Sequence, residues 1–169
     1  MEAISLSPQF DLSEEELSRA RLYRLLSRLL GAPADEELLL FLRSLKGDES
    51  PLGQGLAALS GVADRLSVEE VVQEYNDLFI GLIRGELLPY GSHYLTGFLN
   101  EKPLAELRDA MSKLGIARSD AASEPEDHIA SLFEVMHGMI LGDYGKPVTL
   151  ADQLKFFKDH VETWAIKFF

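Results

Sequence analysis

The chain has 169 residues, of which 46% are hydrophobic, and carries a formal net charge of −12. This length suits one folded domain, and the N-terminus, Met-Glu-Ala-Ile-Ser, lacks the basic and apolar pattern of a secretory signal. No apolar run approaches the roughly 20 residues that span a bilayer, so we expect no stable membrane insertion. The negative charge disfavours nucleic acid and anionic membrane surfaces. Since the sequence has no cysteine, it excludes disulfides and cysteine-ligated metal sites. We expect a cytoplasmic protein that prefers basic partners.

Helix start and stop signals divide the first part of the chain. A capping box at residues 13–16 opens a leucine-rich helix that ends before Pro33. Asp35 caps a second helix, which runs to about Leu45, and residues 46–53 form the clearest loop. A short third helix follows this loop.

A fourth helix begins with a Ser67 capping box and shows the clearest amphipathic pattern. Its apolar positions keep the i, i+3, i+4, i+7 spacing: Val68, Val71, Val72, Tyr75, Leu78, Phe79 and Leu82. After this helix, Ser92 is expected to cap a short helix to about Asn100. Pro103 fits the first turn of the next helix.

The last third of the chain carries the same signals. A capping box at residues 123–126 is predicted to open a helix with Ile129 and Ile140 on its apolar face, and Thr149 is predicted to begin the last helix. The last helix has one apolar stripe: Leu154, Phe157, Val161, Trp164 and Phe168. No segment alternates with a period of two, so the sequence predicts an all-α fold. We expect one irregular globular domain of about eight helices over residues 1–169.

Candidate enzymatic sites are incomplete. Glu124 and His128 have the spacing of a shared helix face, and together with Glu126 they leave a metal-dependent hydrolase as an alternative. A nucleophilic set built on Ser92 and Asp127 lacks the Gly-x-Ser-x-Gly elbow. Glycine-rich phosphate-binding motifs do not occur either. We expect no catalytic residue, no metal and no cofactor.

Two motifs carry a family resemblance. Residues 74–94 join Glu-Tyr-x-x-Leu-Phe to Pro-Tyr-x-Ser-x-Tyr across a loop that is more apolar than solvent requires. Residues 124–128 read Glu-Pro-Glu-Asp-His, an acidic-Pro-x-Asp-His motif. In this order, the two motifs resemble the signature of the TorD/DmsD/NarJ family, cytoplasmic chaperones for molybdenum-containing redox enzymes. The resemblance covers about residues 15–168 and points to the TorD/DmsD-like branch.

This resemblance implies a chaperone that binds a peptide and catalyses no reaction. Its partners would be the twin-arginine leader peptide and the apo form of a molybdoenzyme catalytic subunit. The implied peptide-binding cleft is formed by ten residues of the two motifs: Tyr75, Leu78, Phe79, Pro89, Tyr90, Gly91, Ser92, Tyr94, Asp127 and His128. Asp127 is expected to pair with a guanidinium group of the guest. The alternative within the family is a NarJ-like adaptor for a redox subunit that is not exported.

The chain ends inside an apolar helix, where members of this family usually continue. We therefore expect the C-terminal helices of the family to be short or missing. We expect a monomer or a dimer, and the apolar surface that this leaves would favour dimerisation, including domain swapping.

Overall fold

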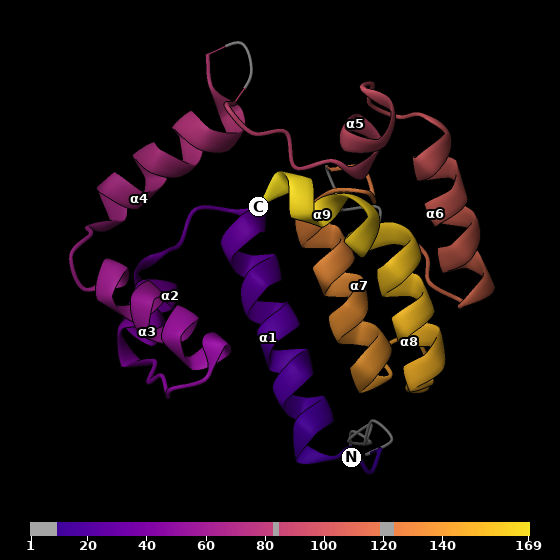
Figure 1. Cartoon of the computed structure of the whole chain (residues 1–169), viewed down its shortest axis with the longest axis horizontal. Coiled ribbons are helices and arrows are strands. Elements are labelled where there is room, and N and C mark those ends of the chain that lie inside the picture. The colour runs from indigo at the N-terminus through magenta and orange to yellow at the C-terminus, as the bar shows by residue number, and fades with distance from the viewer. Residues whose placement is uncertain (1–9, 83–84, 119–123) are drawn as a thin grey trace, which may run out of the picture. The chain divides into compact units, whose positions relative to one another are not determined.

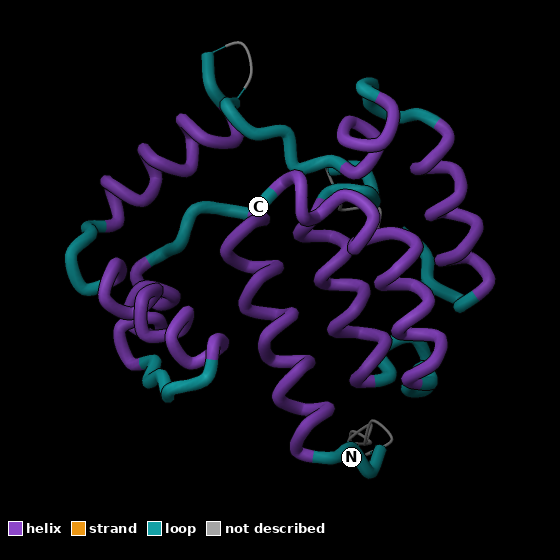
Figure 2. Tube along the Cα trace, viewed as in Figure 1, coloured by secondary structure: helices purple, strands orange, loops and turns teal. Residues whose placement is uncertain are grey.

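The computed structural model describes residues 10–82, 85–118 and 124–169. Over these ranges the chain forms helices joined by loops, with no strand, as Figures 1 and 2 show. The all-α prediction is confirmed. None of the helices in these ranges combines the length and the apolar character that crossing a bilayer requires. The chain divides into two compact units, one formed by Ala32–Leu88 and the other by the segments before and after it.

The described part of the unit Ala32–Leu88 contains three α-helices and one π-helical turn: α2 (Glu36–Ser44), α3 (Pro51–Ala63), α4 (Val68–Tyr75) and η1 (Asn76–Ile80). Asp35 and Ser67 cap α2 and α4 through their side chains, as predicted. The Arg43 guanidinium of α2 donates to the carbonyl oxygens of Ala63, at 2.9 Å, and Leu66, at 3.0 Å. These bonds tie α2 to the end of α3, where the last carbonyl groups have no helical partner.

The amphipathic segment after Ser67 is not one continuous α-helix. α4 ends at Tyr75 and buries none of its residues, and η1 follows until Gly81, which has a φ of 62°. Leu82 is fully exposed. A π-turn contains more residues than an α-turn, so beyond Tyr75 the 3.6-residue spacing no longer predicts which side chains share a face. The prediction of an unbroken apolar face as far as Leu82 is therefore wrong.

The other unit is built on α1 (Glu14–Gly31) packed along α7 (Ile129–Leu141). The α7 helix is apolar on nearly all sides and supplies most of the core of this unit: Ile129, Leu132, Phe133, Met136, Met139 and Ile140 are buried. Tyr23 of α1 lies against Phe133, with 5.8 Å between the ring centroids. Arg24 and Ser27 of α1 both bond to the carboxylate of Glu134.

Five shorter elements complete this unit: α5 (Gly91–Thr96), α6 (Lys102–Lys113), α8 (Leu150–Phe157), the π-helical turn η2 (Lys158–Glu162) and α9 (Thr163–Phe168). α5 contacts both α6 and α9, and α8 contacts α7. Thr149 caps α8 by accepting the Asp152 N–H, which confirms the predicted start of the last helix. The π-turn η2 divides that helix, which the sequence did not indicate.

The π-turn η2 changes which side chains are buried. The buried positions are Gln153 and Phe156 before the turn, and Val161, Trp164 and Phe168 within and after it. The step of five from Phe156 to Val161 is the extra residue of a π-turn. Leu154, which the 3.6-residue stripe assigned to the core, is 51% exposed, so that prediction is wrong for the first half of the stripe.

Two predicted helix starts are also corrected. The N-cap of α5 is Tyr90, so Ser92 lies inside the helix and does not cap it. The α7 helix begins at Ile129 with His128 as its N-cap, and it does not begin at the capping box of residues 123–126. Residue 123 of that box lies outside the described residues.

Candidate functional site

The segments after Leu88 and before α7 meet as two short extended stretches. Tyr90 and His128 face each other in an isolated antiparallel bridge. The Gly91 N–H donates to the carbonyl oxygen of Asp127 at 3.0 Å, and the Ile129 N–H donates to that of Pro89 at 2.9 Å. This backbone pairing joins the Pro-Tyr-Gly-Ser loop, residues 89–92, to Asp127 and His128, although more than thirty residues separate them in sequence. We call these six residues the corner. The structure thus brings together Pro89, Tyr90, Gly91, Asp127 and His128 of the ten predicted site residues.

The Asp127 carboxylate lies inside this corner and is only half satisfied. Its Oδ2 accepts the Ser92 N–H at 2.8 Å, and the residue is 4% exposed. Its Oδ1 and the Ser92 Oγ are buried and have no hydrogen-bond partner among the residues that the structure describes. An unsatisfied buried oxygen costs about 1–3 kcal/mol, and more when it is charged. Asp127 Oδ1 and Ser92 Oγ can therefore each accept a hydrogen bond from a group outside the corner.

The His128 ring supports the start of α7. Its Nδ1 accepts the Ala130 N–H at 3.1 Å, so Nδ1 carries a lone pair and the ring is neutral in this arrangement. Burial lowers the pKa of His128, although the negative charges of Glu124 and Asp127 act in the opposite direction. The Tyr90 ring lies edge-on to the imidazole at 5.2 Å, and its hydroxyl donates to Glu124 at 2.6 Å.

Arg108 of α6 holds the residue before Asp127. Its guanidinium donates two parallel bonds, of 2.9 and 2.8 Å, to the carboxylate of Glu126. This hydrogen-bonded pair keeps the pKa of Glu126 below its ordinary value. Two parallel bonds fix direction as well as distance, so Arg108 sets the position of the turn that carries Asp127. Sequence reasoning missed Arg108, because a single arginine on an amphipathic helix is typical of a solvated face.

Gly91 allows close contact between the corner and α9. A Cβ atom at this position would lie 2.8 Å from Nε1 of Trp164, so any larger residue would force the indole away. The indole donates to the His160 carbonyl oxygen at 2.7 Å and stacks on Tyr94 with 5.5 Å between centroids. Tyr94, a predicted site residue, thus reaches the corner through Trp164. The sequence showed Trp164 only as part of a core stripe.

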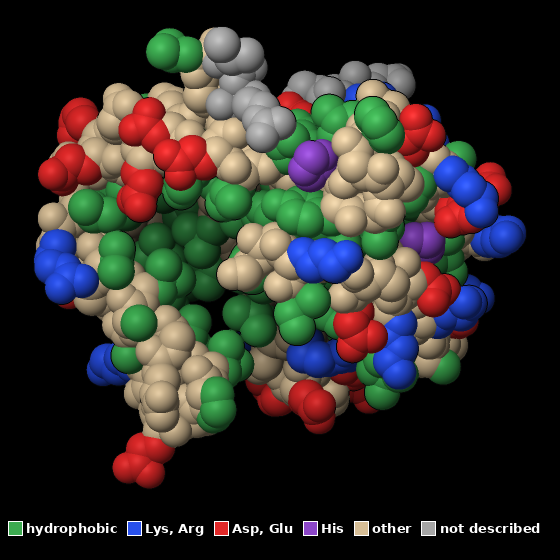
Figure 3. Space-filling model, turned by 45° about the horizontal axis from the view of Figure 1, so that its top comes forward, with side chains coloured by type: hydrophobic (Ala, Val, Ile, Leu, Met, Phe, Trp, Pro, Cys, Tyr) green, Lys and Arg blue, Asp and Glu red, His purple; other side chains and the backbone are tan. Residues whose placement is uncertain are grey.

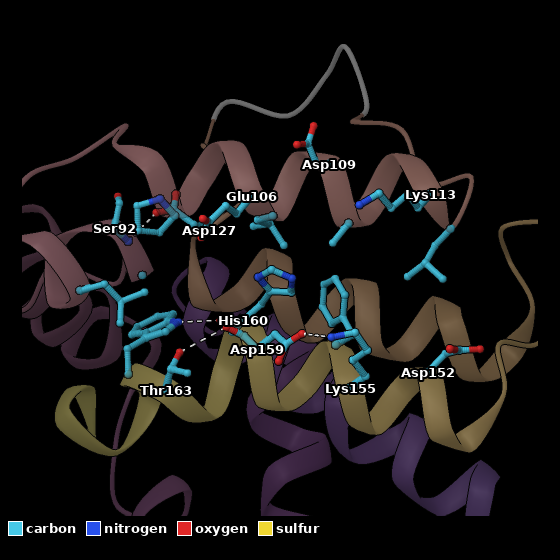
Figure 4. A pocket seen from close by; sticks show the side chains of 18 residues that line it. Ser92, Glu106, Asp109, Lys113, Asp127, Asp152, Lys155, Asp159, His160 and Thr163 are labelled. Atoms are coloured by element: carbon cyan, nitrogen blue, oxygen red, sulfur yellow. Dashed lines mark hydrogen bonds and ion pairs between the residues drawn. The ribbon is translucent and has the colours of Figure 1, made fainter.

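A cavity of about 690 Å³ opens between α5, α6 and the segment α8–η2–α9, and Gly91, Ser92 and Asp127 form part of its lining. Figure 4 shows Ser92, Asp127 and Glu106 at one end and Lys113 at the other. Its volume falls within the roughly 300–1,000 Å³ of ligand pockets. Three of the ten predicted site residues therefore line a cavity, and Pro89, Tyr90 and His128 hold the loop that carries them.

The remaining predicted site residues, Tyr75, Leu78 and Phe79, lie in the unit Ala32–Leu88. Each is half-buried, and the Tyr75 and Phe79 rings lie 4.9 Å apart around the junction of α4 and η1. Their part in a common site stays a prediction.

The three residues of the alternative metal site each make other bonds. Glu124 accepts from Tyr90, Glu126 from Arg108, and the Nδ1 of His128 from the Ala130 N–H. Across the described parts of the chain, no group of three or more His, Asp or Glu side chains is placed to hold a metal ion. This arrangement favours a binding corner over a metal-dependent hydrolase.

Comparison with known proteins identifies relatives along most of the chain. Residues 45–169 match the family model described as nitrate reductase delta subunit. The chain is 27% identical over 171 residues to the chaperone protein TorD of Vibrio atlanticus, covering 89% of this chain and 80% of that protein. It is 29% identical over 162 residues to the chaperone protein TorD of Vibrio cholerae, covering 91% of this chain and 69% of that protein.

A solved structure shares the fold. It is that of a redox enzyme maturation protein from Archaeoglobus fulgidus, with a TM-score of 0.54 and 21% sequence identity. The match covers 92% of this chain and 85% of the other. At this level of sequence identity, the likeness supports a shared helical fold and nothing further.

Proposed function

Since this chain belongs to the nitrate reductase delta subunit family, the family of the TorD and NarJ proteins, we propose that it is a maturation chaperone for one molybdenum-containing oxidoreductase. It binds the twin-arginine signal peptide of the apoenzyme and holds the apoenzyme until folding and cofactor insertion are complete. The proposed action consists of binding and release in the cytoplasm, with no bond made or broken. The names of its relatives as chaperones support this reading.

One observation carries the peptide-binding part of the proposal: Asp127 Oδ1 and Ser92 Oγ are buried beside a cavity and have no hydrogen-bond partner in the described ranges of the chain. A guanidinium group has five N–H donors in a planar fork and remains charged at any pH that the protein meets. One N–H of an arginine can donate to Asp127 Oδ1 while a second donates to Ser92 Oγ. Both oxygens are covered in the free protein, so entry of the arginine requires a small movement of the side chains around them.

The Asp127 carboxylate therefore has two tasks in this proposal. Oδ2 positions the loop by accepting the Ser92 N–H, and Oδ1 receives the guest. Asp127→Asn keeps an oxygen for the Ser92 N–H and replaces the second oxygen with an amide that can only donate. This variant separates the two tasks.

The test is titration of a synthetic twin-arginine leader peptide into the wild-type protein, Asp127→Asn and Asp109→Asn. Asp109 of α6 lines the same cavity but is exposed. Asp109→Asn changes the net charge by the same amount as Asp127→Asn and therefore serves as the control. We expect Asp127→Asn to weaken binding at least about tenfold, since hydrogen bonds to charged groups contribute roughly 1.5–3 kcal/mol. We expect Asp109→Asn to stay within about twofold, as for exposed charges.

Circular dichroism would establish that both variants remain helical. Equal binding by Asp127→Asn and the wild-type protein would remove Asp127 from the site. If the wild-type protein binds the leader equally well after both arginines of the peptide are replaced by alanine, the NarJ-like adaptor would be favoured instead.

A further inference from the structure

The cavity beside Asp127 is much larger than a single guanidinium group requires. Ser92 and Asp127 occupy one end only, and the cavity continues between α6 and α8. Apolar side chains from two helices line it, Leu107 and Ala110 of α6 and Phe156 of α8, beside His160 and the ion pair of Lys155 with Asp159. Leu107 and Phe156 are buried walls, and Ala110 is half-buried where the cavity meets solvent. An arginine seated at Asp127 would leave this apolar part empty.

The two ends of the cavity differ in charge. Asp127 and Glu106 lie together at the α5 end, whereas Lys113 and Asp152, which have opposite charges, lie at the far end (Figure 4). Lys155 forms an ion pair with Asp159 at 2.6 Å, but the side chain of Lys113 has no ion pair or hydrogen bond with any described residue. A guest whose positive charge sits at one end would meet two carboxylates near Asp127, but one ammonium group and one carboxylate at the far end. This asymmetry favours one orientation of the guest.

We propose that the cavity between α6 and α8 holds the apolar segment of the leader peptide that adjoins the arginine pair. An arginine sits at Ser92 and Asp127, and the apolar side chains continue along Leu107, Ala110 and Phe156 toward Lys113. This inference rests on the proposed function and adds to it the path of the peptide. The affinity then has two sources: the charged bonds at one end, and the apolar surface removed from water in the middle.

The π-turn η2 contributes to this path. Its extra residue returns Val161 to the core while Asp159 and His160 stay on the cavity side. An unbroken α-helix through residues 150–168 would shift the side chains after Phe156 by one position. π-turns occur often at functional sites, where they redirect side chains in this way.

Filling the cavity tests the path. Ala110→Trp would place an indole in the apolar middle, and Ala105→Trp would place the same side chain on the same helix at an exposed position outside the cavity lining. With a fluorescently labelled twin-arginine leader, we expect Ala110→Trp to weaken binding at least about tenfold. Ala105→Trp is expected to stay within about twofold of the wild-type protein.

A measurement on the wild-type protein avoids any question of folding. A leader peptide with a benzophenone amino acid four residues after its arginine pair is irradiated in the complex, and the crosslinked protein residues are located by mass spectrometry. Crosslinks within α6 or α8 are expected. Crosslinks confined to Ala32–Leu88, or an Ala110→Trp protein that is folded and binds as tightly as the wild type, would overturn the path and leave the proposed function standing. A wild-type protein that binds no leader would overturn both.

Discussion

At the scale of single residues, His128 connects the proposed site to the core of its unit. Its ring accepts the Ala130 N–H and so caps α7, the most buried helix of the chain. Protonation at Nδ1 would remove that acceptor. Because burial lowers the pKa of His128 in the folded protein, the unfolded chain takes up this proton first as the pH falls.

This linkage predicts a pH dependence of folding. The free energy of unfolding should fall as the pH drops below about 6.5, because the unfolded state then binds more protons than the folded state. His128→Asn keeps a side-chain oxygen for the Ala130 N–H and cannot titrate, so its loss of stability between about pH 7.5 and about pH 5.5 should be smaller. The remaining loss would come in part from His160, whose pKa is also lowered by burial.

Urea unfolding followed by the fluorescence of Trp164, the single tryptophan, measures this effect in the relevant unit. If wild type and His128→Asn lose the same free energy over this pH range, the imidazole does not act as the neutral cap described above.

The residues of the corner show what motifs can and cannot predict. The resemblance placed Asp127 and His128 beside Pro89–Ser92, and the backbone bridge joins these residues. It did not indicate that Arg108 and Trp164 hold the corner from α6 and α9. Their roles arise from tertiary contacts between distant segments, and a single sequence carries no periodic signal for such contacts.

At the scale of elements, local chemistry predicted helix starts well where a side chain caps its own helix. The caps at Ser13, Asp35, Ser67 and Thr149 all occur as expected. The predicted starts of α5 and α7 were wrong because the two chain segments pair with each other before their helices begin. That pairing holds Tyr90 and His128 in extended backbone conformation, which overrides the local preference for helix.

The π-turn η2 makes a second element-scale prediction, since it decides which side of α8 faces the core. Phe156 is 3% exposed and Leu154 is 51% exposed, the reverse of the assignment from the helical period. Phe156→Ala should lower the free energy of unfolding by roughly 3–5 kcal/mol, as for buried phenylalanines. Leu154→Ala should change it by less than about 1 kcal/mol.

Both variants can be compared by urea unfolding under the same conditions. A larger loss for Leu154→Ala than for Phe156→Ala would mean that the last helix follows the uninterrupted α-helical register.

At the scale of the whole molecule, the net charge of −12 shapes encounters with partners. Acidic side chains occur on both units on the face drawn in Figure 3. Under the proposed function, their field would attract a basic peptide over about one Debye length, roughly 8–10 Å at physiological salt, and apolar contacts would hold the peptide once it has docked. The division into two units was not indicated by composition, which does not shift at residue 32 or 88, and the prediction of one domain stays a prediction.

The proposed function depends on recognition of an arginine-bearing leader through its guanidinium groups. Isothermal titration of the wild-type protein with a twin-arginine leader, and with the same peptide carrying alanines in place of both arginines, tests it most directly. We predict that the alanine peptide binds at least about tenfold more weakly, a difference of about 1.4 kcal/mol or more. Equal affinity for the two peptides would contradict the claim.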